Sequence, residues 1–211
     1  MTVNLWTESS HARDYLEHRR HIPHRDEGYA ALLEFVPAAP HRVLDLGTGD
    51  GHLLGQVRDA RRGAAGVAVD FSAEMLTRVR EHFAADPDVT VVDHNLDDPL
   101  PDSLGPFDVV VSAFAIHHVS HERKRALYAE IRDHLEPGGA FCNLDHVASP
   151  TPELHDAFLA SLGKSSNADD PSNQLLDVET QLRWLRELGF ESVDCHWKWR
   201  ELALLAGTTA R

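Results

Sequence analysis

The feature that most constrains the fold of this chain is an alternation of short apolar runs with amphipathic helical patterns, which begins near residue 41. Apolar runs that alternate with helices in this way form a parallel sheet with helices on both faces. The fourth run is long and continuously apolar, which is typical of a central strand buried on both faces. The sequence therefore predicts an α/β fold, with strands at residues 41–47, 65–71, 89–95, 107–119 and 140–147.

The helical patterns and the last strands have recognisable ends. Ser72 can cap a helix with one apolar stripe, and Ser120 opens another that the sequence EPGG breaks at residues 136–139. A last helix is predicted over residues 177–190. Two strand-like runs follow within residues 191–207, and we expect them to pair antiparallel.

The chain of 211 residues is short enough to form a single domain. Its first 40 residues are rich in His and Arg and contain several aromatic residues, and we expect a helical lid there. Prolines, serines and asparagines mark a loop-rich insertion after the fifth strand, and such insertions often carry specificity. The predicted parts of the domain 1–211 are the lid (1–40), the cofactor-binding core (41–147), a substrate-side insertion (148–176) and a last helix with two strands (177–211).

Charge and cysteine content argue against several classes of protein. The formal net charge is −14, and such a field repels the phosphate backbone of nucleic acids. Two cysteines form neither a disulfide framework nor a cysteine-rich zinc site. No apolar run approaches the roughly 20 residues of a membrane span, and no signal-peptide pattern opens the chain. We therefore expect a cytoplasmic monomer or homodimer without nucleic-acid or membrane partners.

A glycine-rich turn, VLDLGTGDG at residues 43–51, joins the first predicted strand to its helix. Such a turn lets a ligand approach backbone N–H groups closely. A dinucleotide fingerprint requires G-x-G-x-x-G. This chain instead has glycine at positions 47, 49 and 51 and histidine at position 52. The spacing therefore argues against a nicotinamide-dependent dehydrogenase.

Acidic, aromatic and amide side chains stand at the predicted strand ends. Asp45 and Asp50 flank the first part of the turn, where they would repel a pyrophosphate and suit a ligand with sulfonium and ammonium groups. Asp70 ends the second strand, where a carboxylate can accept both ribose hydroxyls. Phe71 can pack on an adenine, and the amide of Asn95 can meet its exocyclic nitrogen. Together these residues predict S-adenosylmethionine as the ligand.

At these residues the chain resembles the class I S-adenosylmethionine-dependent methyltransferases, in particular small bacterial members. VLDLGTGDG is similar to their first motif, VAVDFSAEML to their acidic second motif, and residues 107–139 to the stretch that carries their fourth and fifth strands. The resemblance implies a Rossmann-like seven-stranded sheet of order 3-2-1-4-5-7-6, with strand 7 antiparallel. It also implies a methyl donor lying across the carboxyl ends of the first strands.

The same resemblance implies which residues form the cofactor site. Many relatives carry an aspartate where this chain has Asn95. A lid arginine, Arg19 or Arg25, is expected to reach the donor carboxylate. The implied residues are Asp45, Gly47, Thr48, Gly49 and Gly51 around the methionine moiety, Asp70 at the ribose, Phe71, Met75 and Asn95 around the adenine, and Leu96 and Ala113 elsewhere in the site.

Histidines gather where the fourth and fifth strands are predicted to end. His117 and His118 follow the fourth strand, and Asp145 and His146 end the fifth. Methyl transfer needs proximity, orientation and, for a hydroxyl acceptor, a base. The natural-product methyltransferases that this region resembles place a His and an Asp near the acceptor hydroxyl, at the positions of His117 and Asp145. Neighbouring strand residues face opposite ways, so we expect Asp145 rather than His146 in the pocket.

The predicted catalytic residues are therefore His117, His118 and Asp145, acting on a small-molecule hydroxyl. Three alternatives stay open. The histidines could be buried residues that only satisfy hydrogen bonds. A looser resemblance to tRNA wobble-uridine-modifying enzymes would require a basic surface that the net charge conceals. A non-catalytic S-adenosylmethionine-binding protein would keep the glycines and Asp70 but lack an acceptor pocket.

A metal centre is a further alternative. His118, Asp145, His146 and His155 offer ligand types that suit iron, manganese or zinc. No ligand spacing in the sequence demands such a site, because there is no H-x-x-x-H pair on a helix and no cysteine cluster. We therefore predict no metal.

Overall fold

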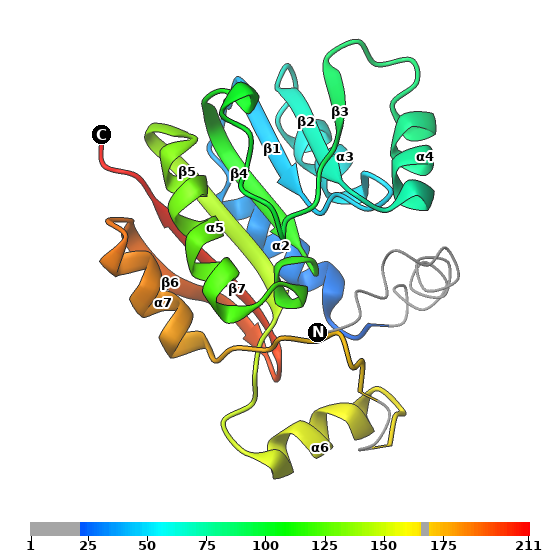
Figure 1. The fold of residues 1–211 in the computed structure, drawn as a ribbon, viewed down its shortest axis with the longest axis vertical. Coiled ribbons are helices and arrows are strands. Elements are labelled where there is room, and N and C mark those ends of the chain that lie inside the picture. Colours follow the sequence, from blue (N-terminus) through cyan, green and yellow to red (C-terminus); the bar gives the residue numbers. More distant parts are fainter. Residues whose placement is uncertain (1–21, 166–168) are drawn as a thin grey trace.

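The computed structural model describes residues 22–165 and 169–211 of the chain. The described strands form one sheet in the order β3-β2-β1-β4-β5-β7-β6 (Figure 1). Strand β7 runs antiparallel to both of its neighbours, so the predicted order and direction are confirmed. The strands are β1 Arg42–Leu46, β2 Ala65–Asp70, β3 Val89–Asp93, β4 Phe107–Ala113, β5 Leu135–His146, β6 Glu191–Trp199 and β7 Leu202–Thr208.

Helices cover both faces of the sheet, as the sequence predicts. On one face, Leu32 of α2 and Leu54 of α3 belong to one buried apolar cluster. On the other face, Leu127 of α5 and Leu185 of α7 belong to a second. The described helices are α2 Arg25–Phe35, α3 His52–Ala60, α4 Ala73–His82, α5 His121–Asp133, α6 Pro152–Ser161 and α7 Val178–Glu187, with short 3-10 turns η3 Asp102–Leu104 and η4 Ile116–His118.

The first five strands are parallel, so their carboxyl ends meet at one edge of the sheet. Asp70 at the end of β2 is in register with Asp93 at the end of β3. Ala113 at the end of β4 is in register with Leu144, close to the end of β5. In an open α/β sheet the ligand binds at this edge, where the strand order reverses.

Strand β4 is shorter than its apolar run predicts. It ends at Ala113 rather than continuing to residue 119. Phe114 adopts a positive φ of 56°, which is uncommon for a bulky residue and turns the chain out of the strand direction. The 3-10 turn η4 follows and places His117 and His118 over the end of the strand.

Strand β5 begins earlier than predicted, at Leu135 rather than near residue 140. Leu135 pairs with Phe107, and pairing resumes between Ala140 and Val109 after a shift in register. Helix α5 ends at Asp133, so residues 136–139 do not break it as predicted and instead lie within an irregular part of the strand. Such a bulge adds residues to one strand without ending the pairing.

Helix α2 is the described part of the predicted lid, because residues 1–21 lie outside the described residues. It contacts β5, β6 and β7 and buries Tyr29 and Leu32, and Val36 directly after it is buried as well. Its apolar side chains are therefore part of the core of the domain. That the first 40 residues act as a lid stays a prediction.

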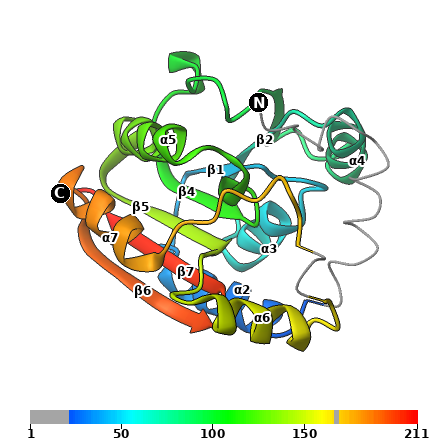
Figure 2. The ribbon, with the colours of Figure 1, turned by 60° about the horizontal axis from the view of Figure 1, so that its bottom comes forward.

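The predicted insertion contains helix α6, which lies at the edge of the molecule (Figure 2), with the ring of Phe158 6.1 Å from that of Trp199 in β6. Thr151 caps this helix, since its hydroxyl accepts a hydrogen bond from the N–H of Leu154. Phe158 of α6 is buried in the same apolar cluster as α2. The amide of Ala148 donates to the carbonyl of Leu176 at 3.1 Å, so the two ends of the insertion meet.

Candidate functional site

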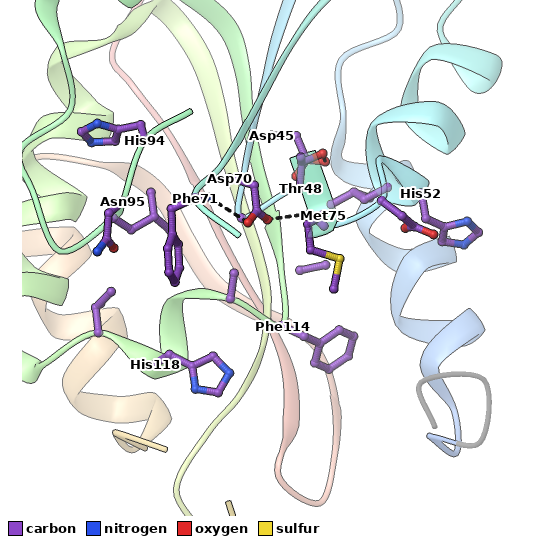
Figure 3. A pocket seen from close by; sticks show the side chains of 18 of the residues that line it. Asp45, Thr48, His52, Asp70, Phe71, Met75, His94, Asn95, Phe114 and His118 are labelled. Atoms are coloured by element: carbon purple, nitrogen blue, oxygen red, sulfur yellow. Dashed lines mark hydrogen bonds between the residues drawn. The ribbon is translucent and has the colours of Figure 1, made fainter. Parts of the chain in front are cut away.

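A cavity of about 860 Å³, open mouth included, lies at the carboxyl ends of β1, β2 and β4 (Figure 3). Its lining includes all but one of the predicted cofactor residues. These are Arg25, Asp45, Gly47, Thr48, Gly49, Asp70, Phe71, Met75, Asn95, Leu96 and Ala113. The exception, Gly51, begins α3 with a φ of 84°, and a Cβ there would lie 2.6 Å from the Phe83 ring. Gly51 therefore lets α3 pack closely on that ring.

The glycine-rich turn brings its backbone to the cavity through positive φ angles. Gly47 has a φ of 67° and Gly49 a φ of 59°, which glycine adopts without a steric penalty. A Cβ on Gly47 would lie 2.2 Å from the Cβ of Ala115, which follows β4. The turn and the end of β4 therefore touch at a point where only a hydrogen atom fits.

The carboxylate of Asp70 is held by three backbone N–H groups. Oδ2 accepts from Gly49 at 2.9 Å, and Oδ1 accepts from Phe71 at 2.8 Å and Ser72 at 2.9 Å. Burial raises the pKa of this carboxyl, and the three N–H groups oppose that effect. The side chain is thus fixed at the cavity wall, with its remaining lone pairs available to a ligand hydroxyl.

Asp45 is a buried acid at the end of β1. Its Oδ2 accepts a hydrogen bond from the Thr48 hydroxyl at 2.7 Å. Its Oδ1 accepts no hydrogen bond of normal geometry among residues 22–165 and 169–211, although the nearby backbone N–H of Leu54 stabilises the ionised carboxylate. Burial raises the pKa of Asp45 to about 7. A buried carboxylate oxygen without a hydrogen bond of normal geometry, at the wall of a cavity, suits a cationic group of a ligand.

Aromatic and amide groups form the side of the cavity nearest β3. Figure 3 shows the Phe71 ring projecting into the cavity and Asn95 beside it. Asn95 Oδ1 accepts from the amide of Asp97 at 3.0 Å, so its N–H2 group is the donor left for a ligand. A flat ring and an oriented amide are the features that an adenine requires.

Arg25, the first residue of α2, lies on the far side of the cavity. It donates from Nε and Nη2 to the hydroxyl of Tyr29 at 3.0 and 2.6 Å. Its guanidinium also stacks 4.8 Å from the centre of the Phe114 ring. These contacts place a fixed positive charge at the cavity, as the predicted contact with a carboxylate requires.

His118 lines the same cavity from the turn η4. Its Nδ1 lies 3.1 Å from the hydroxyl of Ser172, which belongs to the insertion. Burial, and the neighbouring ring of His117, hold the pKa of His118 well below its usual value. The ring is therefore neutral near pH 7 and carries a lone pair that can accept a proton.

His117 and Asp145 form a buried pair behind the cavity. His117 Nδ1 lies 2.5 Å from Asp145 Oδ1, and neither residue lines the cavity. Burial favours the protonated carboxyl, but the charge and hydrogen bond of His117, with Lys124 nearby, hold the pKa of Asp145 below its usual value. The His117 ring lies 3.9 Å from that of His118. The structure thus brings the three predicted catalytic residues together, and only His118 reaches the cavity.

The other histidines considered as metal ligands point elsewhere. His146 Nε2 and His155 Nδ1 lie 2.8 and 3.0 Å from the buried carboxylate of Glu201. Within the described part of the chain, no group of three or more His, Cys, Asp or Glu side chains is arranged to hold a metal ion. Asp145 and His146 contact different side chains, as strand alternation predicts, but Asp145 does not line the cavity in which it was expected, because it pairs with His117 behind the cavity.

Known proteins resemble this chain over most of its length. A family model described as a methyltransferase domain matches residues 43–139. A demethylmenaquinone methyltransferase of Clavibacter sepedonicus is 32% identical over 174 residues, which cover 75% of this chain and 69% of that protein. The chain belongs to the class I S-adenosylmethionine-dependent methyltransferase family.

Further similarities agree with this family. An uncharacterized methyltransferase of Mycobacterium tuberculosis is 35% identical over 131 residues, 62% of each chain. Among solved structures, an O-methyltransferase family protein from Burkholderia thailandensis has a TM-score of 0.73 at 17% identity, covering 97% of this chain and 61% of its own. Human N-acetylserotonin methyltransferase in complex with its methyl donor has a TM-score of 0.69 at 15% identity, covering 98% and 58%. The chain therefore spans about three fifths of several proteins that it matches.

The cavity of this methyltransferase fits S-adenosylmethionine, the cofactor of the family. The ligand combines a cationic methionine moiety with a ribose and an adenine. Asp45, Asp70 and Phe71 present a carboxylate, a fixed acceptor and a ring in that order along the cavity wall.

Within the described residues, no helix is long and apolar enough to cross a membrane.

Sequence reasoning missed several residues that line the cavity of this methyltransferase or support it. Tyr29 lies four residues after Arg25, on the same side of α2, so helical periodicity could have found it. Phe114 directly follows Ala113 and could have been found as the residue where the strand ends. Ser172 stands in a loop without any periodic pattern, and nothing in the sequence connects it to His118. Asp50, which the sequence placed in the glycine-rich turn, also lines the cavity, and the remaining lining residues are His52, Leu53, His94, Asp97, Ala115 and Val119.

Proposed function

We propose that this methyltransferase transfers a methyl group to the hydroxyl oxygen of a small-molecule acceptor, with His118 as the base. One observation carries the proposal: the cavity bounded by Asp45 and Asp70 is also lined by His118. The low pKa of this half-buried ring keeps it neutral near pH 7, so it can accept a proton. A base is needed for a hydroxyl acceptor, which favours oxygen over other methyl-accepting atoms.

The donor side of the cavity supplies groups for each part of the cofactor. S-adenosylmethionine, when bound, supplies a methyl group on a positively charged sulfur. Asp45 Oδ1 would accept from the ammonium group, and Arg25 would face the carboxylate. Asp70 would accept from the ribose hydroxyls, and Phe71 and Asn95 would hold the adenine.

The reaction balances with His118 as the only acid or base. His118 removes the proton of the acceptor hydroxyl while the acceptor oxygen forms its bond to the methyl carbon. The bond between that carbon and sulfur breaks, and its electron pair returns to sulfur. The products are the methyl ether, S-adenosylhomocysteine and a protonated His118, which returns its proton to water. The protein contributes alignment and the base.

A small acceptor agrees with the charge of the chain and with the named relatives. The net charge of −14 opposes binding to tRNA, whose affinity depends on neutralised phosphates. The similar proteins include a demethylmenaquinone methyltransferase and an N-acetylserotonin methyltransferase, whose names are those of small-molecule acceptors. A tRNA substrate would instead predict binding that strengthens steeply as salt is lowered.

Calorimetric titration with S-adenosylmethionine and with S-adenosylhomocysteine tests the cofactor half of the proposal. We expect binding to the wild type and at least tenfold weaker binding to Asp70→Asn, which is about 1.4 kcal/mol. Asp93→Asn is the matched control, because Asp93 occupies the neighbouring register position but does not line the cavity. Absence of binding to the wild type would overturn the proposal.

A label-transfer screen tests the acceptor half. The full chain is incubated with methyl-labelled S-adenosylmethionine and a panel of phenols, aliphatic alcohols, amines and thiols. We expect label on a hydroxyl compound, and a loss of about 100-fold or more in kcat for His118→Gln. Transfer only to amines, thiols or carbon, or full activity of His118→Gln, would contradict the role of His118 as base.

A further inference from the structure

Three side chains from two distant parts of the chain form a line that ends at the cavity. His118 Nδ1 lies 3.1 Å from the Ser172 hydroxyl, and that hydroxyl donates to Asp170 Oδ1 at 2.7 Å. The Ser172 amide donates to the same Oδ1 at 2.8 Å. The serine is buried, with 6% of its surface exposed. Its hydroxyl is therefore fixed between a ring nitrogen and a carboxylate.

The hydrogen count along this line determines where the His118 proton sits. A carboxylate only accepts hydrogen bonds, and a serine hydroxyl has one proton to give. Because the Ser172 proton points to Asp170, the serine oxygen can only accept from Nδ1. The neutral His118 ring therefore carries its proton on Nδ1, and its lone pair is on Nε2.

The loop that carries Ser172 is tied to the end of β4 and to α5. The amide of Gln174 donates to the carbonyl of His117 at 2.8 Å. The carbonyl of Gln174 accepts from Lys124 Nζ at 3.0 Å, and that lysine is buried in α5. The His121 ring donates to the carbonyl of Leu175 at 3.0 Å. These bonds hold the serine in place relative to His118.

We propose that Ser172 and Asp170 are positioning residues for His118, and that they fix the tautomer in which Nε2 is the proton acceptor. The insertion thus contributes the side chains that determine the tautomer of His118, in addition to any contact with the acceptor. The inference rests on the proposed function for its catalytic meaning, since a fixed tautomer matters where the ring takes a proton. The tautomer itself is a property of the protein without any substrate.

Nitrogen NMR measures the tautomer directly. The full chain is labelled with ¹⁵N-histidine, long-range proton–nitrogen spectra are recorded at pH 7.5, and the His118 signals are assigned from their loss in His118→Gln. We expect wild-type His118 to be neutral with the proton on Nδ1. In Ser172→Ala we expect at least half of the ring population to shift to the form with the proton on Nε2. Asp170→Asn is expected to shift the population in the same direction.

Two controls separate positioning from a general structural effect. Ser172→Thr keeps a hydroxyl and is expected to restore the Nδ1 form. Ser161→Ala removes another serine of the insertion, whose hydroxyl donates to the Phe158 carbonyl, and is expected to change nothing at His118. The ring of His134, bound by carbonyls of Glu130 and Pro101, serves as the reference in each spectrum.

The outcomes distinguish this inference from the proposed function. A wild-type His118 with its proton on Nε2, or one unchanged in both Ser172→Ala and Asp170→Asn, would overturn the inference even when S-adenosylmethionine binds. Failure of the cofactor to bind would overturn the proposed function while the tautomer stayed measurable. With an acceptor in hand, Ser172→Ala should lower kcat about tenfold or more with little change in KM, because the base and not the binding surface is altered.

Discussion

The cavity has a donor side at Asp45 and Asp70 and a proposed acceptor side at His118, and the side chains of the two sides are fixed by different kinds of hydrogen bond. On the donor side, Asp70 is fixed by three backbone N–H groups, the most distant of them 21 residues away. On the acceptor side, His118 is fixed by the side chain of Ser172, 54 residues away. Every residue except proline supplies a backbone N–H, whereas most single substitutions of a serine remove its hydroxyl. The donor side is therefore specified by the path of the turn, and the acceptor side by individual side chains.

The largest effect is expected from Asp145→Ala. This change leaves the buried His117 and Lys124 without their carboxylate, and breaking a buried ion pair costs about 3–5 kcal/mol. Urea unfolding followed by circular dichroism measures the loss. Asp70→Ala is the counterpart on the donor side, and we expect a smaller loss because water in the cavity can reach the exposed amides. Equal losses in the free energy of unfolding for Asp145→Ala and Asp70→Ala would contradict the proposed difference between the two sides of the cavity.

Gly47→Ala should produce the next largest effect, and it tests the backbone side of the comparison. The new Cβ would overlap the Cβ of Ala115, and the positive φ adds strain, so we expect a loss of about 3 kcal/mol in the free energy of unfolding. Cofactor affinity should fall about 100-fold as the turn shifts. Gly63→Ala has a similar φ but no described atom within 4 Å, so it should cost only about 1 kcal/mol. A similar cost for both would exclude the overlap.

The pH dependence of cofactor binding tests whether Asp45 contacts the cofactor as an ionised carboxylate. Its pKa is about 7 in the unliganded protein, and a bound cation favours the ionised carboxylate. Affinity should therefore fall about tenfold for each pH unit below 7. The free energy of unfolding of the unliganded protein changes in the opposite direction. The Asp45 pKa is about 7 in the native state, against an ordinary value of 3.8 in the unfolded chain, so only the native state binds this proton between these pH values. The stabilisation from the proton is therefore lost as pH rises through about 7.

Calorimetry at pH 5.5, 6.5 and 7.5, in buffers of different ionisation enthalpy, measures both the affinity and the protons released. Asp45→Asn has no such proton, and we expect weaker binding with a flat profile over this range. A wild type that releases no proton on binding at pH 6 would show that Asp45 is already ionised.

The smallest effect is expected from His155→Ala. This side chain reaches Glu201 from α6 and is partly exposed, so we expect a loss of about 1 kcal/mol in the free energy of unfolding. Cofactor affinity should stay within twofold of the wild type, because Glu201 lies away from the donor side. His41→Ala at an exposed position is the control. A tenfold fall in cofactor affinity would show that the two sides are coupled through α6.

The sequence predicted the donor side closely because its contacts are local. Asp45 and Thr48 lie three residues apart, and the apolar alternation determines which strand ends carry Asp70 and Asn95. The strand order followed from the family resemblance and is confirmed. Gly51 was also predicted at the cofactor; it does not line the cavity, and a Cβ on it would meet the Phe83 ring, which the residue pattern does not reveal.

The acceptor side could be predicted only in part. His117, His118 and Asp145 were expected near one another. Which histidine reaches the cavity depends on the turn at Phe114, and the positive φ of this residue cannot be predicted from the residue pattern. Asp170 and Ser172 belong to a loop without periodicity, and their position follows from hydrogen bonds to elements about 50 residues earlier. Such pairings appear only when the chain is folded.

The bond between Ala148 and Leu176 has a consequence for how such a protein can change over time. A segment whose two ends meet leaves and re-enters the domain at one point, so it can be lengthened, replaced or exchanged with the corresponding segment of a homologue while the sheet keeps its pairing. Because this segment carries Ser172 and Asp170, an exchange would replace both residues in the line that ends at His118. The residues of the insertion and the hydrogen-bond partners of the proposed base His118 would then be inherited together.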